Sequence, residues 1–367
     1  MPEKVSTDSG TNYLILVPTM LLLCLGLVMI YSASSNLGQL RLGDGYFYLK
    51  KQAIFCMIGV AVMFAARYVP YTLYSKFVYP LLIISICLLG LLFVPALARQ
   101  IGGAHRWLNL GPLTFQPSEL VKFSLAVYMA YSMSKKSAEM ASFSKGVLPH
   151  LLVAGILMVL VLLQPDLGTT VIMGIWVLIA LFVGGVRMFH ISTIFLLCSP
   201  VVIWLITRAD YRINRWLAFM DPWEDPTGIG FQIIHSFLAF GSGGIFGAGL
   251  GNSKQKLFYL PESHTDFVLS ITGEELGLLG VTSIIILFGT LILGGIRVAL
   301  KARDLYSTYL ALGLTSFLGL QVIINMAVVL GLLPTKGLTL PLISYGGSSL
   351  IMTLLSIGVL LNISARS

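Results

Sequence analysis

The sequence predicts an all-α polytopic membrane protein, with residues 1–367 forming a single membrane-embedded domain. Apolar residues make up 57% of the chain, and its mean hydropathy is +0.91. Only 10% of the residues are charged, against about 25% in a soluble domain. This composition excludes a disordered chain, a disulfide-bonded scaffold and an ordinary soluble enzyme. The four cysteines lie in apolar stretches without metal or redox spacing, so we expect small buried hydrophobic side chains.

Ten stretches are long and apolar enough to form membrane-spanning helices, each of which needs roughly 20 mostly apolar residues. They lie at about 12–34, 52–69, 74–95, 117–134, 147–164, 168–186, 189–207, 266–296, 306–331 and 339–363. The first stretch is too long for the core of a cleaved signal peptide, so we expect a retained helix. No internal repeat of fixed period is evident.

The basic residues indicate the orientation of these helices. Ten crossings place both termini on one side of the membrane. With the termini in the cytoplasm, the short segments carry 11 basic residues inside and 7 outside. The other basic residues lie in one long loop, whose charges count little in the positive-inside rule. We therefore expect cytoplasmic termini and a large extracytoplasmic loop, 208–265, between the seventh and eighth helices.

This loop contains two unusual segments. Phe231–Phe240 reads FQIIHSFLAF, a pattern that favours an amphipathic or half-buried helix. The glycine-rich run 241–251 is not a nucleotide-binding P-loop, because no Gly-Lys-Ser/Thr follows it. Two interpretations stay open for this run: a backbone cradle or hinge near Lys254 and Lys256, or re-entrant packing.

A polar stripe is predicted at the start of the eighth helix. Asp266, Ser270 and Glu274 are spaced by four residues and therefore share one helix face. At 1.5 Å per residue, Glu274 lies roughly 12 Å below Asp266. An ionised side chain at mid-bilayer costs at least about 2.5 kcal/mol, so Glu274 requires a partner or a wet surrounding. Asp266 itself suits either a helix cap or a general base at the membrane surface.

Other polar residues lie at the ends of predicted helices on the same outer face. Glu119 and Lys122 are three residues apart and can form an ion pair, and Asp166 follows a Gln-Pro pair in a turn. Each of these also fits a purely structural role as helix start or turn. Arg106 and Trp107 fit an interfacial anchor as well as a binding site, and Lys336 precedes the last helix.

Five segments together resemble the SEDS family, named for shape, elongation, division and sporulation. They are QPSELVKF (116–123), QPDLGT (164–169), KLFYLPESHTDF (256–267), GEELGLLG (273–280) and LPTKGLTLPLISYGGSS (333–349). The last segment is more similar to the division member of the family than to the elongation member, and the sporulation member is similar there too.

The resemblance implies a peptidoglycan glycosyltransferase that polymerises lipid II on the outer face of the cytoplasmic membrane, during cell division at the septum. It implies a class B penicillin-binding protein as the transpeptidase partner, together with other divisome membrane proteins. The basic residues form no contiguous patch, so we expect no nucleic-acid partner. Asp266 matches the essential aspartate of the family, Glu119 and Lys122 match its Glu–Lys pair, and Asp166 matches the acidic residue of its QPD turn.

The reaction that this implies is a single inverting displacement of undecaprenyl pyrophosphate. A base must remove the proton of the acceptor hydroxyl, and cations must stabilise the departing pyrophosphate. Asp266 is the predicted base, and Trp107 could stack on a sugar. The candidate cations are Arg106, Lys122, Arg212, Arg215, Lys254 and Lys336. A divalent cation (Mg²⁺ or Mn²⁺) could assist with Asp166 or Glu119 as ligand, although no spacing indicates a metal site.

Two other functions stay open at this point. A lipid II flippase would also need a polar stripe within the membrane, and Glu274 suits it. A non-catalytic divisome scaffold would only recruit the transpeptidase. Without the resemblance, composition and spacing do not separate a transporter from a membrane enzyme.

Overall fold

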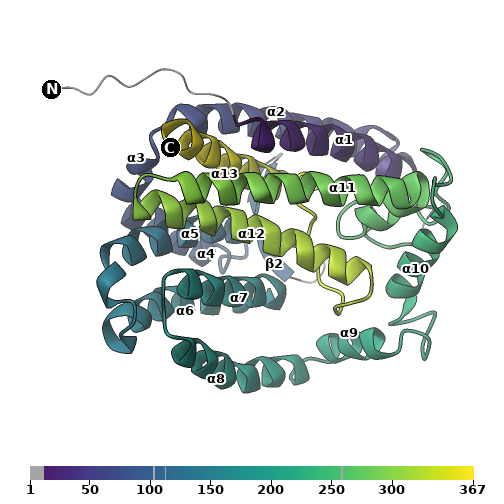
Figure 1. The fold of residues 1–367 in the computed structure, drawn as a ribbon. Coiled ribbons are helices and arrows are strands. Elements are labelled where there is room, and N and C mark those ends of the chain that lie inside the picture. The colour runs from purple at the N-terminus through teal and green to yellow at the C-terminus, as the bar shows by residue number, and fades with distance from the viewer. Residues whose placement is uncertain (1–11, 102–103, 112, 258) are drawn as a thin grey trace.

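The computed structural model describes residues 12–101, 104–111, 113–257 and 259–367. The chain folds into a bundle of helices that run side by side between two ends (Figure 1). The helices are α1 (Tyr13–Leu42), α2 (Phe47–Tyr68), α3 (Tyr71–Lys76), α4 (Val78–Leu91), α5 (Pro117–Lys135), α6 (Leu148–Leu162), α7 (Leu167–Val183), α8 (Met188–Thr207), α9 (Asp210–Met220), α10 (Phe231–Gly243), α11 (Val268–Lys301), α12 (Leu305–Val329) and α13 (Gly347–Arg366).

The polytopic helical class is confirmed, and each of the ten predicted ranges overlaps a helix, with boundaries that differ by up to about eight residues. Among the described residues, seven helices are long and apolar enough to cross a membrane, and the apolar helices α4 and α7 are shorter. The remaining predicted range, 117–134, corresponds to α5, which is less apolar because it carries Glu119 and Lys122. Asn12 Nδ2 donates to Ser364 Oγ at 3.1 Å, so the start of α1 and the end of α13 lie at the same end of the bundle.

A small antiparallel sheet, which the all-α prediction omitted, connects α4 to α5. Its strands are β1 (Ala98–Ile101), β2 (Ala104–Leu110) and β3 (Leu113–Phe115), in the order β1-β2-β3. Asn109 pairs with Thr114, and Gly111 takes the positive φ of 76° that the β2–β3 turn requires. The strands are too short to show a clear alternation in the sequence. The sheet matters because β2 carries Arg106 and Trp107.

The core forms where helices pack closely on α12 and α13. Trp176 of α7 stacks on Phe317 of α12 with 4.1 Å between ring centroids, and its Nε1 donates to Gly313 O at 3.0 Å. Glycines allow the close approach of α2 and α13: a Cβ on Gly358 would lie 2.4 Å from Met63 O. These contacts pack α7 on α12 and α2 on α13.

The loop between α8 and α11 is largely structured. α8 has no buried residue and leads into α9 along one edge of the molecule, apart from α12 (Figure 1). The predicted half-buried helix at 231–240 is present as α10, which buries Ile233, Ile234 and Ala239.

The prediction of buried cysteines is wrong. Cys24, Cys87 and Cys198 are exposed on their helices, and Cys56 is half-buried. An apolar stretch of a membrane helix has one face on the protein and another on lipid, and small apolar side chains suit both.

Candidate functional site

The site begins with the turn that leads into α11. Glu262 adopts a positive φ of 54°, and its carbonyl oxygen accepts hydrogen bonds from Thr265 N at 3.2 Å and Phe267 N at 3.3 Å. Asp266 lies at the end of this turn, and α11 starts two residues later than its predicted boundary. Asp266 is therefore outside the membrane-spanning helix, at one end of the bundle.

The loop between α12 and α13, together with Asn325 of α12, holds this turn through three successive carbonyl oxygens. Tyr345 N donates to His264 O at 3.0 Å, and Ser344 Oγ donates to Thr265 O. Asn325 Nδ2 donates to Asp266 O at 3.1 Å and to Leu338 O at 2.6 Å. Because these bonds use only the backbone, they fix the position of Asp266 and leave its carboxylate available.

The carboxylate of Asp266 faces Gly337 of that loop. A Cβ built on Gly337 would lie 3.5 Å from Asp266 Oδ2. Loss of surrounding water, with a smaller contribution from the charge of Glu262, raises the pKa of Asp266 to about 7, against the opposite effect of Arg215 and Arg106. A carboxylate with a pKa near neutrality is well matched to the task of a general base.

Arg106 and Asp166 lie beside this carboxylate. Arg106 Nη1 is 3.9 Å from Asp166 Oδ1, and its Nε donates to Gln164 O at 3.3 Å. Asp166 Oδ1 accepts from Thr169 N at 3.1 Å, which makes it the N-terminal cap of α7. Asp166 therefore has the structural role predicted for a turn residue and also contacts Arg106.

The segment Lys336–Gly337 lies between the Arg106–Asp166 pair and Asp266. A Cβ on Gly168 would lie 3.7 Å from Asp166 Oδ1 and 3.9 Å from Lys336 Cβ, so the start of α7 packs on the α12–α13 loop. Burial lowers the pKa of Lys336. Since Lys336 is adjacent to Gly337, the structure brings Asp266, Asp166, Arg106 and Lys336 together.

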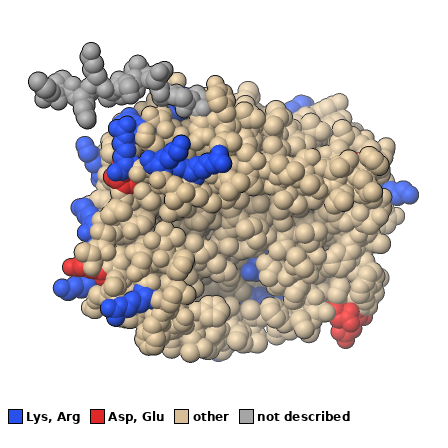
Figure 2. All heavy atoms as spheres, in the orientation of Figure 1, with Lys and Arg blue, Asp and Glu red and all other residues tan. Residues whose placement is uncertain are grey.

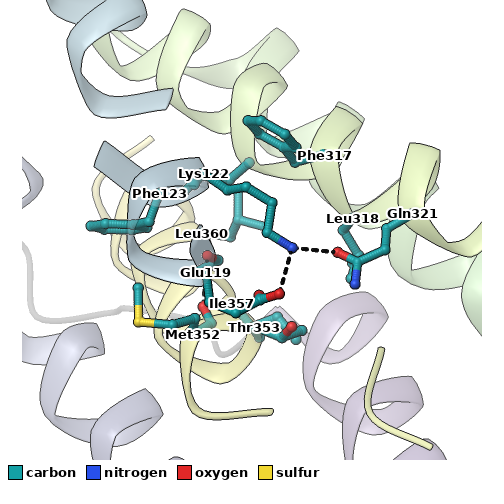
Figure 3. Close-up of a pocket in the computed structure, with 12 residues that line it drawn as sticks. Glu119, Lys122, Phe123, Phe317, Leu318, Gln321, Met352, Thr353, Ile357 and Leu360 are labelled. Carbon is teal, nitrogen blue, oxygen red and sulfur yellow. Dashed lines mark hydrogen bonds and ion pairs between the residues drawn. The ribbon is translucent and has the colours of Figure 1, made fainter. Parts of the chain in front are cut away.

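Glu119 and Lys122 form the predicted ion pair in a cleft between α5, α12 and α13 (Figure 3). Lys122 Nζ is 2.9 Å from Glu119 Oε1 and 3.1 Å from Gln321 Oε1. Gln321 Nε2 in turn donates to Thr339 O at 3.3 Å, which ties the pair to the loop that holds Asp266. The cleft has about 40 Å³ of space for water molecules, enough for a few.

The predicted polar stripe is present on α11, but protein covers it. Ser270 Oγ is 2.8 Å from Ser236 Oγ of α10. Glu274 is buried and accepts from Lys254 N at 2.9 Å and Gln255 N at 3.3 Å. The stripe is therefore internal packing, because α10 and the turn at 253–256 fold back over this face of α11.

Sequence reasoning missed a buried ion pair beside this stripe. Lys256 Nζ is 2.9 Å from Glu275 Oε1, and the two side chains are 6% and 0% exposed. Ser32 of α1 donates to Glu275 Oε1 at 2.6 Å. The signal was visible as a second acidic residue in the apolar GEELGLLG segment. Lys256 is thus committed to Glu275 and does not face the carboxylate of Asp266.

The glycine-rich run packs against a break in α11, which favours the re-entrant interpretation. Gly277 has φ 66° and ψ −163° inside the helix. Ala248 N donates to Glu274 O at 2.9 Å, and Leu278 N donates to Gly244 O at 2.9 Å. The run thereby satisfies backbone groups that the break leaves open.

Three further predicted binding residues lie on β2, on α9 and in the turn at 253–256. Trp107 is half-buried in β2, beside Arg106. Arg212 of α9 donates to Leu205 O at 2.6 Å and lies over the ring of Tyr211. Lys254 contributes its backbone to Glu274. Binding roles for these residues stay predictions, as does the divalent cation. The part of the chain that the structure describes has no cluster of three His, Cys, Asp or Glu side chains suited to a metal.

The fold and this geometry define a polytopic membrane protein that holds the carboxylate of Asp266 at one end of the bundle, where Arg106 and Arg215 act on it and Gly337 faces it. Residues 12–367 match the model of the FtsW, RodA and SpoVE family, described as "Cell cycle protein". The chain belongs to this family, and the resemblance to the SEDS proteins is confirmed.

Curated relatives are similar over nearly the whole chain. "Probable peptidoglycan glycosyltransferase FtsW" of Geobacter sulfurreducens (strain ATCC 51573 / DSM 12127 / PCA) is 48% identical over 355 residues, which cover 97% of this chain and 95% of the relative. "Stage V sporulation protein E" of Bacillus subtilis (strain 168) is 42% identical over 365 residues, covering 100% and 99%. The name of the first relative includes the activity that the resemblance implied, and the name of the second refers to sporulation.

Solved structures show the same fold. A chain described under "Structural coordination of polymerization and crosslinking by a peptidoglycan synthase complex" has a TM-score of 0.77 at 31% identity, with 96% of each chain covered. The rod shape determining protein RodA of Thermus thermophilus has a TM-score of 0.71 at 29% identity, covering 100% of this chain and 98% of that one.

Proposed function

We propose that this protein is a peptidoglycan glycosyltransferase that polymerises lipid II during cell division. The observation that carries this proposal is the carboxylate of Asp266, held by three backbone hydrogen bonds next to Arg106 and Lys336. Its pKa of about 7 lets it accept a proton at neutral pH.

In the proposed reaction, Asp266 removes the proton of an acceptor sugar hydroxyl. The hydroxyl oxygen forms a bond to the anomeric carbon of the donor while the bond from that carbon to pyrophosphate breaks. The electron pair leaves with undecaprenyl pyrophosphate, the anomeric configuration inverts, and the proton stays on Asp266 until water removes it. No further reactant is needed, because the pyrophosphate bond activates the donor.

The cations near Asp266 would stabilise the charge that develops on the leaving group. Arg106 acts electrostatically on the carboxylate, Lys336 precedes the glycine that faces it, and Lys122 lies in the cleft between α5, α12 and α13. Such groups are effective because they are already oriented when the charge appears. Asp166 and Glu119 are the two acidic side chains there that would bind Mg²⁺ or Mn²⁺, which would supply additional positive charge to the pyrophosphate.

We further propose that the site faces the outside of the cytoplasmic membrane, with both termini in the cytoplasm, and that the protein works beside a class B penicillin-binding protein in the divisome. The similar solved chain is described as part of a peptidoglycan synthase complex that coordinates polymerisation and crosslinking, which supports such a partner. An outer site also agrees with a substrate that carries its own activation, since no ATP is available there.

The test is polymerisation by purified protein with its transpeptidase partner and lipid II. Asp266→Asn should reduce the rate by about 10²–10⁴, because it removes the base and preserves the shape of the side chain. Asp44→Asn is the matched control, since Asp44 is an exposed aspartate paired with Lys50 after α1. Long strands made by Asp266→Asn would contradict the proposal. Labelled lipid II that crosses vesicle membranes without being linked would favour a flippase instead.

A further inference from the structure

Two amide side chains of α12 lie one helical turn apart and bond to the loop that faces Asp266. Gln321 is 7% exposed and Asn325 is 2% exposed. Gln321 Nε2 donates to Thr339 O at 3.3 Å, and Asn325 Nδ2 donates to Leu338 O at 2.6 Å. The two amides therefore hold two successive carbonyl oxygens of the α12–α13 loop.

Asn325 joins this loop to Asp266 itself, because its Nδ2 also donates to Asp266 O at 3.1 Å. Leu338 N donates to Lys336 O at 2.9 Å, which makes Gly337 the central residue of a three-residue turn. Gly337 is the residue that faces Asp266 Oδ2. One buried amide thus bonds both to the residue that carries the carboxylate and to the turn that covers it.

The oxygen of this amide indicates that packing alone does not explain asparagine here. Asn325 Oδ1 is buried and has no hydrogen-bond partner in the part of the chain that the structure describes. Such an atom costs free energy, and leucine, which has a similar shape, would avoid that cost. The reverse orientation of the amide would place Oδ1 against two carbonyl oxygens. What asparagine supplies at this position is therefore a pair of donors.

We propose that Asn325, assisted by Gln321, is a positioning residue that holds the turn at 336–338 against the carboxylate of Asp266 and thereby limits the water around it. This inference rests on the proposed function, because Asn325 acts on the reaction only through the proposed base. Asn325 does not touch the reacting atoms, so its effect is exerted through the place and the hydration of Asp266.

The pKa of Asp266 reports whether the turn covers the carboxylate. Loss of surrounding water is the largest cause of its value of about 7, so a loosened turn should lower it. The charges that also act on Asp266 are those of Glu262 in its own turn, Arg215 of α9 and Arg106 of β2, and variants of α12 do not remove them. Lys336 lies in the covering turn itself, so the experiment includes a variant without that charge.

The first test compares the pH profiles of polymerisation. Asn325→Leu removes both hydrogen bonds and keeps the approximate shape of the side chain. Its midpoint should lie about one pH unit below that of the wild type, since only one wall around the carboxylate is loosened. Its plateau rate should be lower by about 10–10², because a displacement of about 1 Å can cost that much.

Asn362→Leu is the matched control. Asn362 of α13 is also 2% exposed, donates to Arg67 O at 2.6 Å and accepts from Tyr71 N at 2.9 Å. It lies at the other end of the bundle, 15 residues along α13 from Gly347, or about 22 Å. This variant also loses two buried hydrogen bonds, so it can lower the amount of folded protein, but it should leave the midpoint unchanged.

A second measurement needs no lipid II. Dicyclohexylcarbodiimide modifies protonated carboxyl groups, and Asp266 is half-buried, so the reagent can reach it. Peptide mass spectrometry follows the modification of Asp266 as pH varies. Its midpoint should move to lower pH in Asn325→Leu, also in a Lys336→Met background, and by less in Gln321→Met. It should move to higher pH in Gly337→Ala, whose added methyl group would lie 3.5 Å from Asp266 Oδ2 and exclude more water.

The outcomes separate this inference from the proposed function. If the wild-type protein makes no polymer, the proposed function fails, while the modification of Asp266 still decides whether Asn325 controls its carboxylate. A wild-type midpoint in Asn325→Leu, or an equal shift in Asn362→Leu, would overturn the inference. If Asn325→Leu does not fold, Gln321→Met and Gly337→Ala decide, and wild-type midpoints in both would overturn it.

Discussion

At the residue scale, the backbone of Asp266 is fixed by hydrogen bonds, while its carboxylate can change protonation state near neutral pH. The hydrogen bonds from Asn325, Ser344 and Tyr345 occupy the carbonyl oxygens of residues 264–266. The carboxylate itself faces a glycine, and its proton affinity is set by lost water and by charges of both signs. The groups that position Asp266 are thus different from the groups that set the pKa of its carboxylate.

This separation predicts the pH dependence of polymerisation. A base acts only when deprotonated, so with a pKa of about 7 the rate should rise as pH rises through 7. Below that pH it should fall about tenfold per unit, because the carboxylate fraction falls by that factor. Arg215→Gln should move the midpoint to higher pH, since it removes a charge that lowers this pKa. Initial rates between pH 5 and 9 measure both effects, and a profile without a midpoint near neutrality would refute the assignment of the base.

At the scale of elements, α11 has a break at Gly277, and the glycine-rich run 241–251 packs against this break. Gly277 has a positive φ of 66°, and a Cβ there would lie 2.4 Å from Gly247 N. The break lets the glycine-rich run reach Glu274 and Glu275, and the segment from Lys256 to Asp266 starts at that point. The position of the turn that carries Asp266 therefore depends on contacts nearly three helical turns away.

Gly277→Ala should destabilise the protein by about 1–3 kcal/mol, because alanine is strained at this φ and its Cβ meets backbone atoms. Gly289→Ala in the same helix is the control. A Cβ at Gly289 meets nothing within 4 Å, so alanine should be neutral or slightly stabilising there. Thermal unfolding in detergent measures the difference, and equal melting temperatures would show that the break is not needed.

Glu275→Gln should cost about 3–5 kcal/mol, since it leaves the buried Lys256 without a counter-charge. Lys256→Met added to Glu275→Gln should recover much of this loss, because no charge then remains buried. Lys50→Met is a useful comparison, as it removes an exposed ion pair worth less than about 1 kcal/mol. If the double variant is as unstable as Glu275→Gln alone, the charge balance is not the cause.

At the scale of the molecule, charge is distributed by end. Figure 2 shows basic side chains gathered mainly at the end where the termini lie, with a charge-poor face between the two ends. Basic side chains are also visible in a hollow of that face. This pattern agrees with the proposed orientation, in which the cytoplasmic end is rich in Lys and Arg and the opposite end carries the proposed site.

The orientation can be tested with single cysteines in a variant without Cys24, Cys56, Cys87 and Cys198. Tyr46→Cys lies between α1 and α2, and Thr72→Cys lies in α3 at the opposite end. In intact cells, a membrane-impermeant maleimide should label position 46 and leave position 72 unlabelled until the membrane is opened. The reverse labelling would place the termini outside.

The sequence alone determined the helices, the family and most of the chemistry. Hydrophobic stretches about as long as the bilayer is thick can be located by counting, which is why ten helices were found where they were predicted. The five motifs located Asp266, Asp166 and the Glu119–Lys122 pair, because these side chains are costly in a membrane and therefore conspicuous. Only tertiary structure decided which charges meet. It brought Arg106 and the 336–337 segment to Asp266, covered Glu274 with the turn at 253–256, and paired Lys256 with Glu275. These outcomes depend on helix packing and on a loop that folds back across 20 or more residues, and no local pattern records such distant contacts.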